Sequence, residues 1–302
     1  MASIAEQALL FGRSKSLVGV LARASSEPPA SRPTVVILNS GIVHRVGHHR
    51  MYVTMARQLA AAGYNVLRFD FSGIGDSPSR GGDLSPIANF QMDIAEALDW
   101  LEASCGASNF VLVGLCSGAD TALQYGHSDK RVVGLVLLDP TIPPTARFYL
   151  HYIGQRLIRL RSWLSFARGR GRIWQDMVER MSLAVAGKRS GSRTSLIDPG
   201  MRGQLERVYA SLGARGARLL VVLTGDASQG RQSYREQLLD AFPNVPFEDK
   251  LCLEHFRSSD HTFTSDADRE RLNELVLTWI GATPFGLSAS SANVGAGDTN
   301  VA

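Results

Sequence analysis

Short apolar runs alternate along this chain with longer stretches whose apolar residues recur at helical spacing. The runs near the middle are almost continuous in Val, Ile and Leu, which is typical of strands buried on both faces of a sheet. This alternation predicts an α/β protein with a mostly parallel central sheet flanked by helices. We expect strands at residues 17–22, 34–39, 65–71, 110–115, 132–139, 218–224 and 245–253, and helices at residues 51–62, 87–103, 117–125, 234–241 and 266–280.

One long segment interrupts the alternation. Nearly eighty residues separate two consecutive predicted strands in the second half of the chain, and their aromatic and aliphatic residues recur at helical spacing. A loop of that length is uncommon inside a compact domain, so residues 141–215 are predicted to form a helical cap. Residues 1–140 and 216–281 then form the two parts of the core. The Gly, Ala, Ser and Thr of residues 282–302 predict a disordered tail.

Composition and charge indicate an ordinary globular protein with one basic region. Of the 302 residues, 44% are hydrophobic and 20% are charged, a balance far from that of disordered or fibrous chains. The net charge is +4, but segment 141–215 holds 14 Lys and Arg against four Asp and Glu, a net charge of +10 that leaves −6 on the rest. The sequence therefore predicts a basic cap on an acidic body.

The sequence also argues against several classes of protein. No apolar run approaches the about 20 residues of a membrane-spanning helix, and the N-terminus lacks the pattern of a signal peptide, so we expect a cytoplasmic protein without a membrane span. The three cysteines stand at unrelated spacings, which predicts neither disulfides nor a zinc site. Gly73 and Gly75 lack the third glycine and the immediate helix of a dinucleotide loop. We expect no cofactor.

The sharpest motif is a strand, a turn and a helix around Gly114-Leu-Cys-Ser-Gly118. It has the form of a nucleophile elbow, in which small residues two positions before and after the nucleophile let the strand and the helix approach each other. Cys116 is the central residue, at a helix N-terminus that favours a thiolate. Centring the motif on Ser117 would place Leu115 and Ala119 at the glycine positions, so Cys116 fits better. Ser117 stays open as an alternative nucleophile, and the other alternative is that Cys116 is an inert core cysteine.

A base and an acid can be sought from their order along the chain, in which acid and then histidine follow the nucleophile. His261 stands between the last predicted strand and the terminal helix, the position of a general base. Asp226, just after the strand at residues 218–224, is the first choice for the acid that orients the imidazole. Asp139, at the end of the preceding strand, is the alternative acid, although an aspartate before a proline is also common in turns.

Acyl transfer also requires donors for the oxyanion that develops on the substrate. In an elbow of this kind, one donor is the backbone N–H of the residue after the nucleophile, here Ser117, and the other comes from the loop after an early strand. The loop that follows residues 34–39 contains Gly41, which lets the backbone turn beneath a substrate. The amide of Ile42 is our candidate for the second donor.

At this point the chain resembles the α/β-hydrolase superfamily from Thr34 to Ile280. The resemblance is carried by Asn39-Ser-Gly41, Asp70-Phe-Ser-Gly-Ile-Gly-Asp-Ser77, the Gly114–Gly118 elbow and Asp260-His-Thr-Phe263. A narrower resemblance, to the hydrolases associated with exosortase and exopolysaccharide loci, is carried by Asn39-Ser-Gly-Ile-Val-His-Arg-Val-Gly47, Phe69-Asp-Phe-Ser-Gly-Ile-Gly-Asp-Ser77 and Asp260-His-Thr-Phe263.

The resemblance implies an α/β-hydrolase fold with a helical cap inserted after the sixth strand. It also implies an esterase-like or thioesterase-like enzyme with a cysteine nucleophile, as in dienelactone hydrolases. Members of the superfamily often place the acid two or three residues beyond the strand-end glycine, whereas Asp226 directly follows Gly225. The choice between Asp226 and Asp139 therefore stays open.

The loop after Gly41 is basic and suggests how a substrate is attracted. His44 and Arg45 open it, and with Gly41 they are candidate substrate-binding residues. Together with the basic cap they would form a positive funnel that attracts an anionic substrate or an acidic acyl carrier protein. His48 and His49 have no carboxylate at ligand spacing, so no metal is expected.

These observations favour an enzyme that cleaves or transfers an acyl group of a small-molecule ester or thioester through an acyl-cysteine intermediate. Hydrolysis, transfer and lactonisation all remain open, because a thioester is easily intercepted by a second nucleophile. A second hypothesis is a non-catalytic relative whose basic cap binds an acidic partner or nucleic acid. The combination of elbow, histidine and oxyanion loop favours the enzyme, without nucleic acid as its partner.

Overall fold

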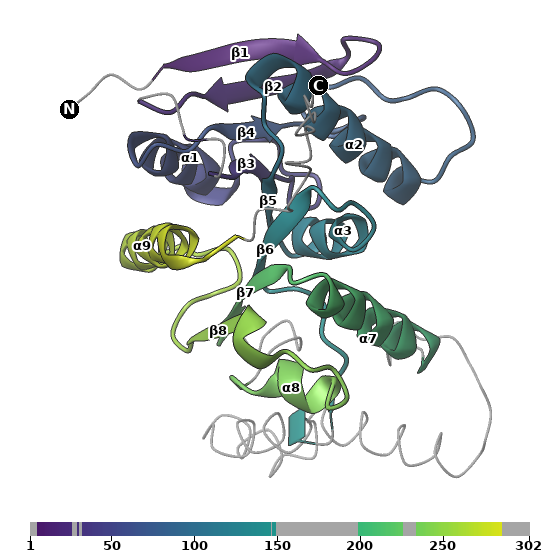
Figure 1. The fold of residues 1–302 in the computed structure, drawn as a ribbon, viewed down its shortest axis with the longest axis vertical. Helices are drawn as coiled ribbons and strands as arrows, with labels where there is room; N and C mark the ends of the chain where they lie inside the picture. The colour runs from purple at the N-terminus through teal and green to yellow at the C-terminus, as the bar shows by residue number, and fades with distance from the viewer. Residues whose placement is uncertain are drawn as a thin grey trace, which may run out of the picture.

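The computed structural model describes residues 5–25, 29, 32–145, 147–148, 199–225 and 234–285. They contain an eight-stranded sheet in the order β1-β2-β4-β3-β5-β6-β7-β8 (Figure 1). Pairing is antiparallel for β1 with β2 and for β2 with β4, and parallel for every other pair. The predicted fold class, a mostly parallel sheet flanked by helices, is confirmed.

The elements have the following bounds. The strands are β1 Glu6–Phe11, β2 Leu17–Ala22, β3 Thr34–Ile37, β4 Val66–Phe69, β5 Phe110–Leu115, β6 Val132–Leu138, β7 Arg218–Thr224 and β8 Leu251–Phe256. The helices are α1 Met51–Ala61, α2 Pro86–Cys105, α3 Ser117–Gly126, α7 Pro199–Ala214, α8 Gln237–Ala241 and α9 Asp266–Ala282, with short 3-10 turns η1 His48–Arg50 and η3 Glu248–Lys250.

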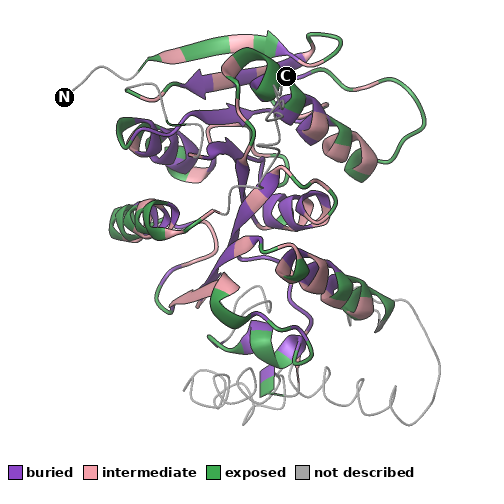
Figure 2. Ribbon diagram, viewed as in Figure 1, coloured by how far each residue is buried: buried purple, intermediate pink, exposed green. Residues whose placement is uncertain are grey.

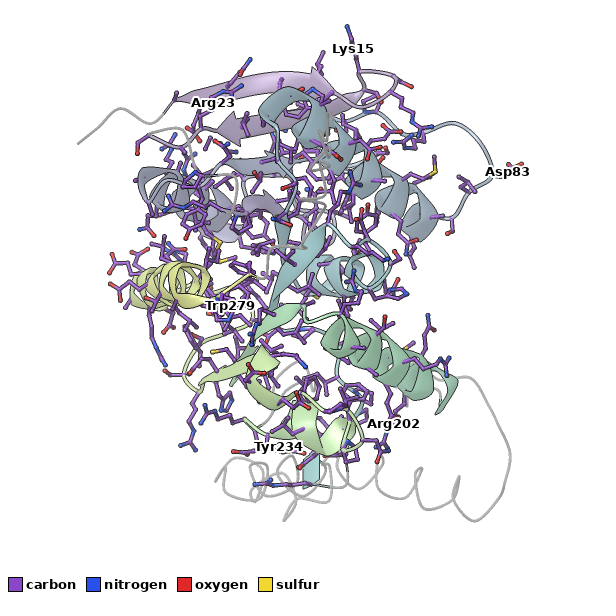
Figure 3. The ribbon with its side chains drawn as sticks, in the orientation of Figure 1. Lys15, Arg23, Asp83, Arg202, Tyr234 and Trp279 are labelled. Carbon is purple, nitrogen blue, oxygen red and sulfur yellow. The ribbon has the colours of Figure 1, made fainter. Side chains whose placement is uncertain are left out.

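Helices cover the sheet on both faces, and the central strands are buried along almost their whole length (Figure 2). Alternate residues of β5 enter different cores: Leu112 packs with the cluster under α2, α3, α7 and α8, whereas Val113 packs with the cluster under α1 and α9. Trp279 of α9 reaches the sheet beside Gly134 of β6 (Figure 3), where a Cβ would lie 3.3 Å from its ring. Burial on both faces explains why the middle strands read as continuous apolar runs.

Two strands differ most from the sequence prediction. β1 was not expected, because it is an antiparallel edge strand with several exposed side chains, and its apolar run is short. The last strand was expected at residues 245–253, but β8 begins at Leu251. Val245 and Phe247 are buried in the core before the strand begins, and η3 intervenes, so apolar residues there mark packing rather than a strand.

The segment expected as a cap has its last part on the sheet. α7 lies within residues 141–215, and its Leu205, Val208, Tyr209 and Leu212 join the core that α3 also covers. Their spacing of three or four residues gives α7 one apolar face. Residues 149–198 of the expected cap, and all but four residues of the expected tail, lie outside the described part.

All the parallel strands deliver their carboxyl ends to the same edge of the sheet, where ligands bind in open α/β folds. Cys116 follows β5, Asp139 follows β6, Asp70 follows β4, and the loop that holds His261 follows β8. The fold thus gathers residues that lie far apart in the sequence. Among the described helices, none combines the length and the apolar composition that crossing a bilayer requires.

Candidate active site

Cys116 occupies the sharp turn between β5 and α3. Its backbone has φ 57° and ψ −119°, a strained conformation for a residue with a side chain. The flanking glycines permit this turn: a Cβ on Gly114 would lie 2.3 Å from the backbone of Gly118, and a Cβ on Gly118 would lie 2.3 Å from the carbonyl oxygen of Asn39. The strand and the helix can therefore approach as the elbow motif requires, with Cys116 at its centre and half-buried.

His261 links Cys116 to a carboxylate. Its Nδ1 lies 2.7 Å from Oδ2 of Asp139, and its ring also hydrogen-bonds the Cys116 side chain. The hydrogen bonds to Asp139 and Cys116 and the charges of these two groups raise the pKa of His261 to about 9, against the opposing effect of burial. At neutral pH the imidazole is therefore predominantly protonated.

Asp139 is fully buried and held in a fixed orientation by Thr224 at the end of β7. The Thr224 backbone N–H donates to Oδ1 at 2.7 Å, and its hydroxyl donates to Oδ2 at 2.5 Å. Because Oδ2 also meets His261, both carboxylate oxygens are satisfied inside the protein. Asp139 is thus the acid that the structure brings to His261, whereas Asp226 lies outside the described residues. Nothing in the sequence singled out Thr224, since strand-end threonines are common.

The loop after β3 turns tightly beside the elbow. Ser40 and Val43 form an isolated antiparallel bridge around Gly41, which has φ 56°. The N–H of Gly41 donates to Oγ of Ser117 at 2.7 Å. The Gly41 amide thus points at the elbow, one residue before the predicted donor Ile42, whose side chain is 92% exposed.

A buried carboxylate holds this loop through hydrogen bonds and an ion pair. Asp70 is fully buried and accepts hydrogen bonds from the backbone N–H of Arg45 at 2.6 Å and of Asp76 at 3.1 Å. It also forms an ion pair with the Arg45 guanidinium, which reaches Asp76 at 2.7 Å as well. Gly75 is required here, because a Cβ would lie 2.3 Å from Asp70 Oδ2. Arg45, expected at the substrate, is engaged by two carboxylates of the protein.

Asn39 connects that carboxylate to the turn. Its Nδ2 donates to the Val43 carbonyl oxygen at 2.9 Å and to Asp70 Oδ1 at 3.3 Å, and its Oδ1 accepts from the Phe71 N–H at 2.8 Å. The sequence motifs around Asn39 and Asp70 were visible, but the roles of these two side chains were missed. A buried Asp directly after a strand, followed by two glycines, was the available signal.

The histidines of the basic loop lie at the rim. His44 is exposed, and His49 Nε2 lies 3.4 Å from the Thr264 hydroxyl, next to the loop of His261. His48 is half-buried, and burial together with the neighbouring charges of His49 and His261 lowers its pKa. Within the described residues, no group of three or more His, Cys, Asp and Glu side chains could hold a metal ion.

Comparison with known proteins agrees with this architecture. A family model described as serine aminopeptidase, S33, matches residues 32–190. No curated protein matches the chain.

Solved structures with the same fold include an esterase of Pyrococcus furiosus, with 15% identity, coverage of 92% of each chain and a TM-score of 0.55. A serine hydrolase without lid from Xanthomonas campestris has 16% identity, coverage of 94% of this chain and 98% of its own, and a TM-score of 0.50. The esterase domain of a Rhodothermus marinus protein has 16% identity, coverage of 92% and 97%, and a TM-score of 0.51. At such low identities these likenesses show the fold.

Proposed function

We propose, from the premise that the chain belongs to the serine aminopeptidase S33 family of α/β hydrolases, that it cleaves or transfers an acyl group of an ester or thioester through an acyl-cysteine intermediate. The observation that carries the proposal is the chain of contacts from Cys116 through His261 to Asp139. A nucleophile, a base and an orienting carboxylate in hydrogen-bond contact form the arrangement that covalent acyl transfer needs.

The first half-reaction starts from an ion pair. The protonated His261 imidazole, with its pKa raised to about 9, holds the proton that Cys116 gives up and stabilises the thiolate. The thiolate sulfur attacks the carbonyl carbon, and the electron pair of the C=O bond moves to the oxygen. The Ser117 amide and an amide of the loop after β3 donate to that oxyanion. As the bond to the leaving group breaks, His261 passes its proton to the departing alkoxide or thiolate.

The second half-reaction releases the acyl group. His261, now neutral, takes a proton from water or from another nucleophile as that molecule attacks the thioester carbonyl. The C–S bond then breaks, and the thiolate and imidazolium are restored. Asp139 keeps Nδ1 of the ring turned towards itself through both steps, so that the other nitrogen faces the reacting atoms.

Cys116 is proposed as the nucleophile although the family description names a serine enzyme. The neighbouring Ser117 hydroxyl is occupied by the N–H of Gly41, while His261 contacts the Cys116 side chain. A nucleophile must lie next to its base, and this favours the cysteine. The likeness of three of the motifs to hydrolases of exosortase and exopolysaccharide loci is consistent with this choice.

The charged residues around the rim of the site bear on the class of substrate. Arg45 is paired with carboxylates of the protein, so attraction of an anionic substrate or an acidic acyl carrier protein would depend on His44, the exposed Arg50 and the basic segment 141–215. The alternative of a non-catalytic binding protein is not favoured, because the family and the esterase structures that share the fold are hydrolytic.

Mass spectrometry of the acyl-enzyme tests the proposal. Wild type and Cys116→Ala are exposed briefly to a panel of activated esters and acyl thioesters, with Cys252→Ala as the matched control for loss of a half-buried thiol elsewhere. We expect an acyl adduct on Cys116 that turns over with time, persists in Cys252→Ala and is lost in Cys116→Ala. Label on Ser117 would move the nucleophile by one residue. A folded protein that no donor acylates would contradict the proposal.

A further inference from the structure

The side chain of Ser117 forms a contact that the reaction described above does not use. Ser117 is the first residue of α3 and is exposed, and its Oγ accepts the N–H of Gly41 at 2.7 Å. The bond joins two segments 76 residues apart. We propose that Ser117 is a positioning residue whose hydroxyl holds the oxyanion loop against the nucleophile elbow. The inference rests on the proposed function and deepens it at the same site.

Hydrogen bonds with buried polar side chains fix both ends of the loop. Asn39 binds the Phe71 amide at one end and the Val43 carbonyl on the far side of the turn. Arg45 is anchored by its backbone N–H to Asp70. These bonds tie the loop to the sheet. They leave its position relative to the elbow to other contacts.

The tip of the loop is where the Ser117 bond acts. Gly41 is exposed, and a Cβ built on it would have no atom within 4 Å, so packing does not restrain the tip. Ile42, the next residue, has a side chain that is 92% exposed. The Ser117 hydroxyl therefore supplies a direct bond between this unpacked tip and the residue that follows the nucleophile.

The placement of that bond matters for an oxyanion site. One donor is the Ser117 amide, and the other comes from the tip, so both must point at the same oxygen. Donors are effective when they are fixed in advance at hydrogen-bond distance from the place where charge develops. A bond from the Ser117 side chain to the tip sets the separation of the two donors directly. Such positioning acts on the transition state more than on substrate binding.

The test compares three variants with wild type. Ser117→Ala removes the hydroxyl, and Ser117→Thr retains it. Thr121→Val is the matched control, because its hydroxyl lies on the same helix and bonds the Ser117 carbonyl oxygen rather than Gly41. For each protein we would measure single-turnover acylation of Cys116 by p-nitrophenyl acetate over a range of concentrations, and hydrogen exchange in a peptide that spans residues 38–45.

We expect Ser117→Ala to lower the maximal acylation rate about 10-fold, a modest displacement of one donor, with the half-saturating ester concentration unchanged. Exchange in residues 38–45 should be faster in Ser117→Ala. Ser117→Thr should recover most of the rate and of the protection that Ser117→Ala loses, and Thr121→Val should match wild type in both measurements. A lower maximal acylation rate at an unchanged half-saturating ester concentration distinguishes positioning of the donors from a general loss of structure.

The outcomes separate this inference from the proposed function. Wild-type acylation with an equal rate and equal exchange in Ser117→Ala would overturn the inference and leave the proposed function standing. If wild type is not acylated at all, the proposed function fails, and the exchange data alone decide whether the hydroxyl positions the loop. If Ser117→Thr behaved like Ser117→Ala in both measurements, the assignment of the positioning role to the hydroxyl would also be overturned.

Discussion

The two halves of the site are held in place by different forces. Cys116, His261 and Asp139 stand directly after or near strand ends of a sheet whose central strands are almost entirely buried, and Asp139 itself is fully buried. The loop of Gly41 and Ile42 is exposed and is held by hydrogen bonds from polar side chains. Packing of the sheet thus fixes the backbone of the proposed nucleophile half, where hydrogen bonds then orient Asp139 and His261. In the proposed oxyanion half, a polar network holds the backbone of the loop itself. Substitutions in the first half should lower the catalytic rate by orders of magnitude, and those in the second half should lower it less.

The largest effect is expected at the carboxylate of the nucleophile half. Asp139→Asn should lower kcat/KM by about 1,000-fold, because the amide no longer stabilises the imidazolium or holds its tautomer. Steady-state ester hydrolysis measures this, with Asp226→Asn as the comparison. If the loss occurred in Asp226→Asn and not in Asp139→Asn, the acid would be Asp226.

A smaller effect on rate is expected at Asp70, the buried carboxylate that supports the oxyanion loop. Asp70→Asn removes the charge that pairs with Arg45 and weakens its bond to the Arg45 backbone. We expect unfolding free energy to fall by about 3 kcal/mol, as for a buried ion pair that loses one partner, and kcat to fall about 10-fold while the Cys116 thiol stays reactive. Urea unfolding and alkylation with iodoacetamide measure the two. Loss of thiol reactivity in a folded protein would show that the halves are not independent.

Loss of the Thr224 hydroxyl should have a smaller effect on both stability and kcat/KM. Thr224→Val keeps the shape but removes the donor to Asp139 Oδ2, which should cost about 1 kcal/mol of stability and a few-fold in kcat/KM. Thr224→Ser keeps the donor and should recover the rate. Equal rates in the valine and serine variants would mean that the backbone N–H of Thr224 alone orients the carboxylate.

The stability of the fold should also depend on pH through His261. The pKa of His261 is raised in the folded protein to about 9 from an ordinary 6.5, so its protonated form stabilises the fold. That contribution is complete below about pH 6.5 and is lost as pH rises through 9. The difference in unfolding free energy between wild type and His261→Gln should therefore shrink between these limits. A difference that grows with pH would reverse the sign of the argument.

The placement of Cys116 and Asp139 at strand ends was predictable, because both residues follow strands with strong patterns. The continuous apolar runs located β5, β6 and β7, and the elbow glycines located Cys116. The acid was harder to choose. Asp139 and Asp226 both follow strands, and only three-dimensional contacts show that Asp139 meets His261 while Thr224, at the end of β7, serves that carboxylate.

The oxyanion half was less predictable, because its contacts join residues far apart in the sequence. The Gly41–Ser117 bond depends on how the loop after β3 meets the elbow after β5, and the Arg45–Asp70 bond on how it meets the loop after β4. No periodicity of the sequence predicts either contact. The charge of residues 141–215 also did not predict how their last part packs. α7 carries Arg202 and Arg207 on its outside, yet its apolar face packs on the sheet, so a basic composition did not mark a separate layer.

The central claim is that His261 holds Cys116 as a thiolate in the resting protein. The most direct measurement is the rate of Cys116 alkylation by iodoacetamide at pH 6, in wild type and in His261→Gln, followed by peptide mass spectrometry. Because ordinary thiols are protonated at that pH, the account predicts rapid alkylation of the wild-type residue and a rate at least about 10-fold lower in the variant. Equal, slow alkylation in both folded proteins would contradict it.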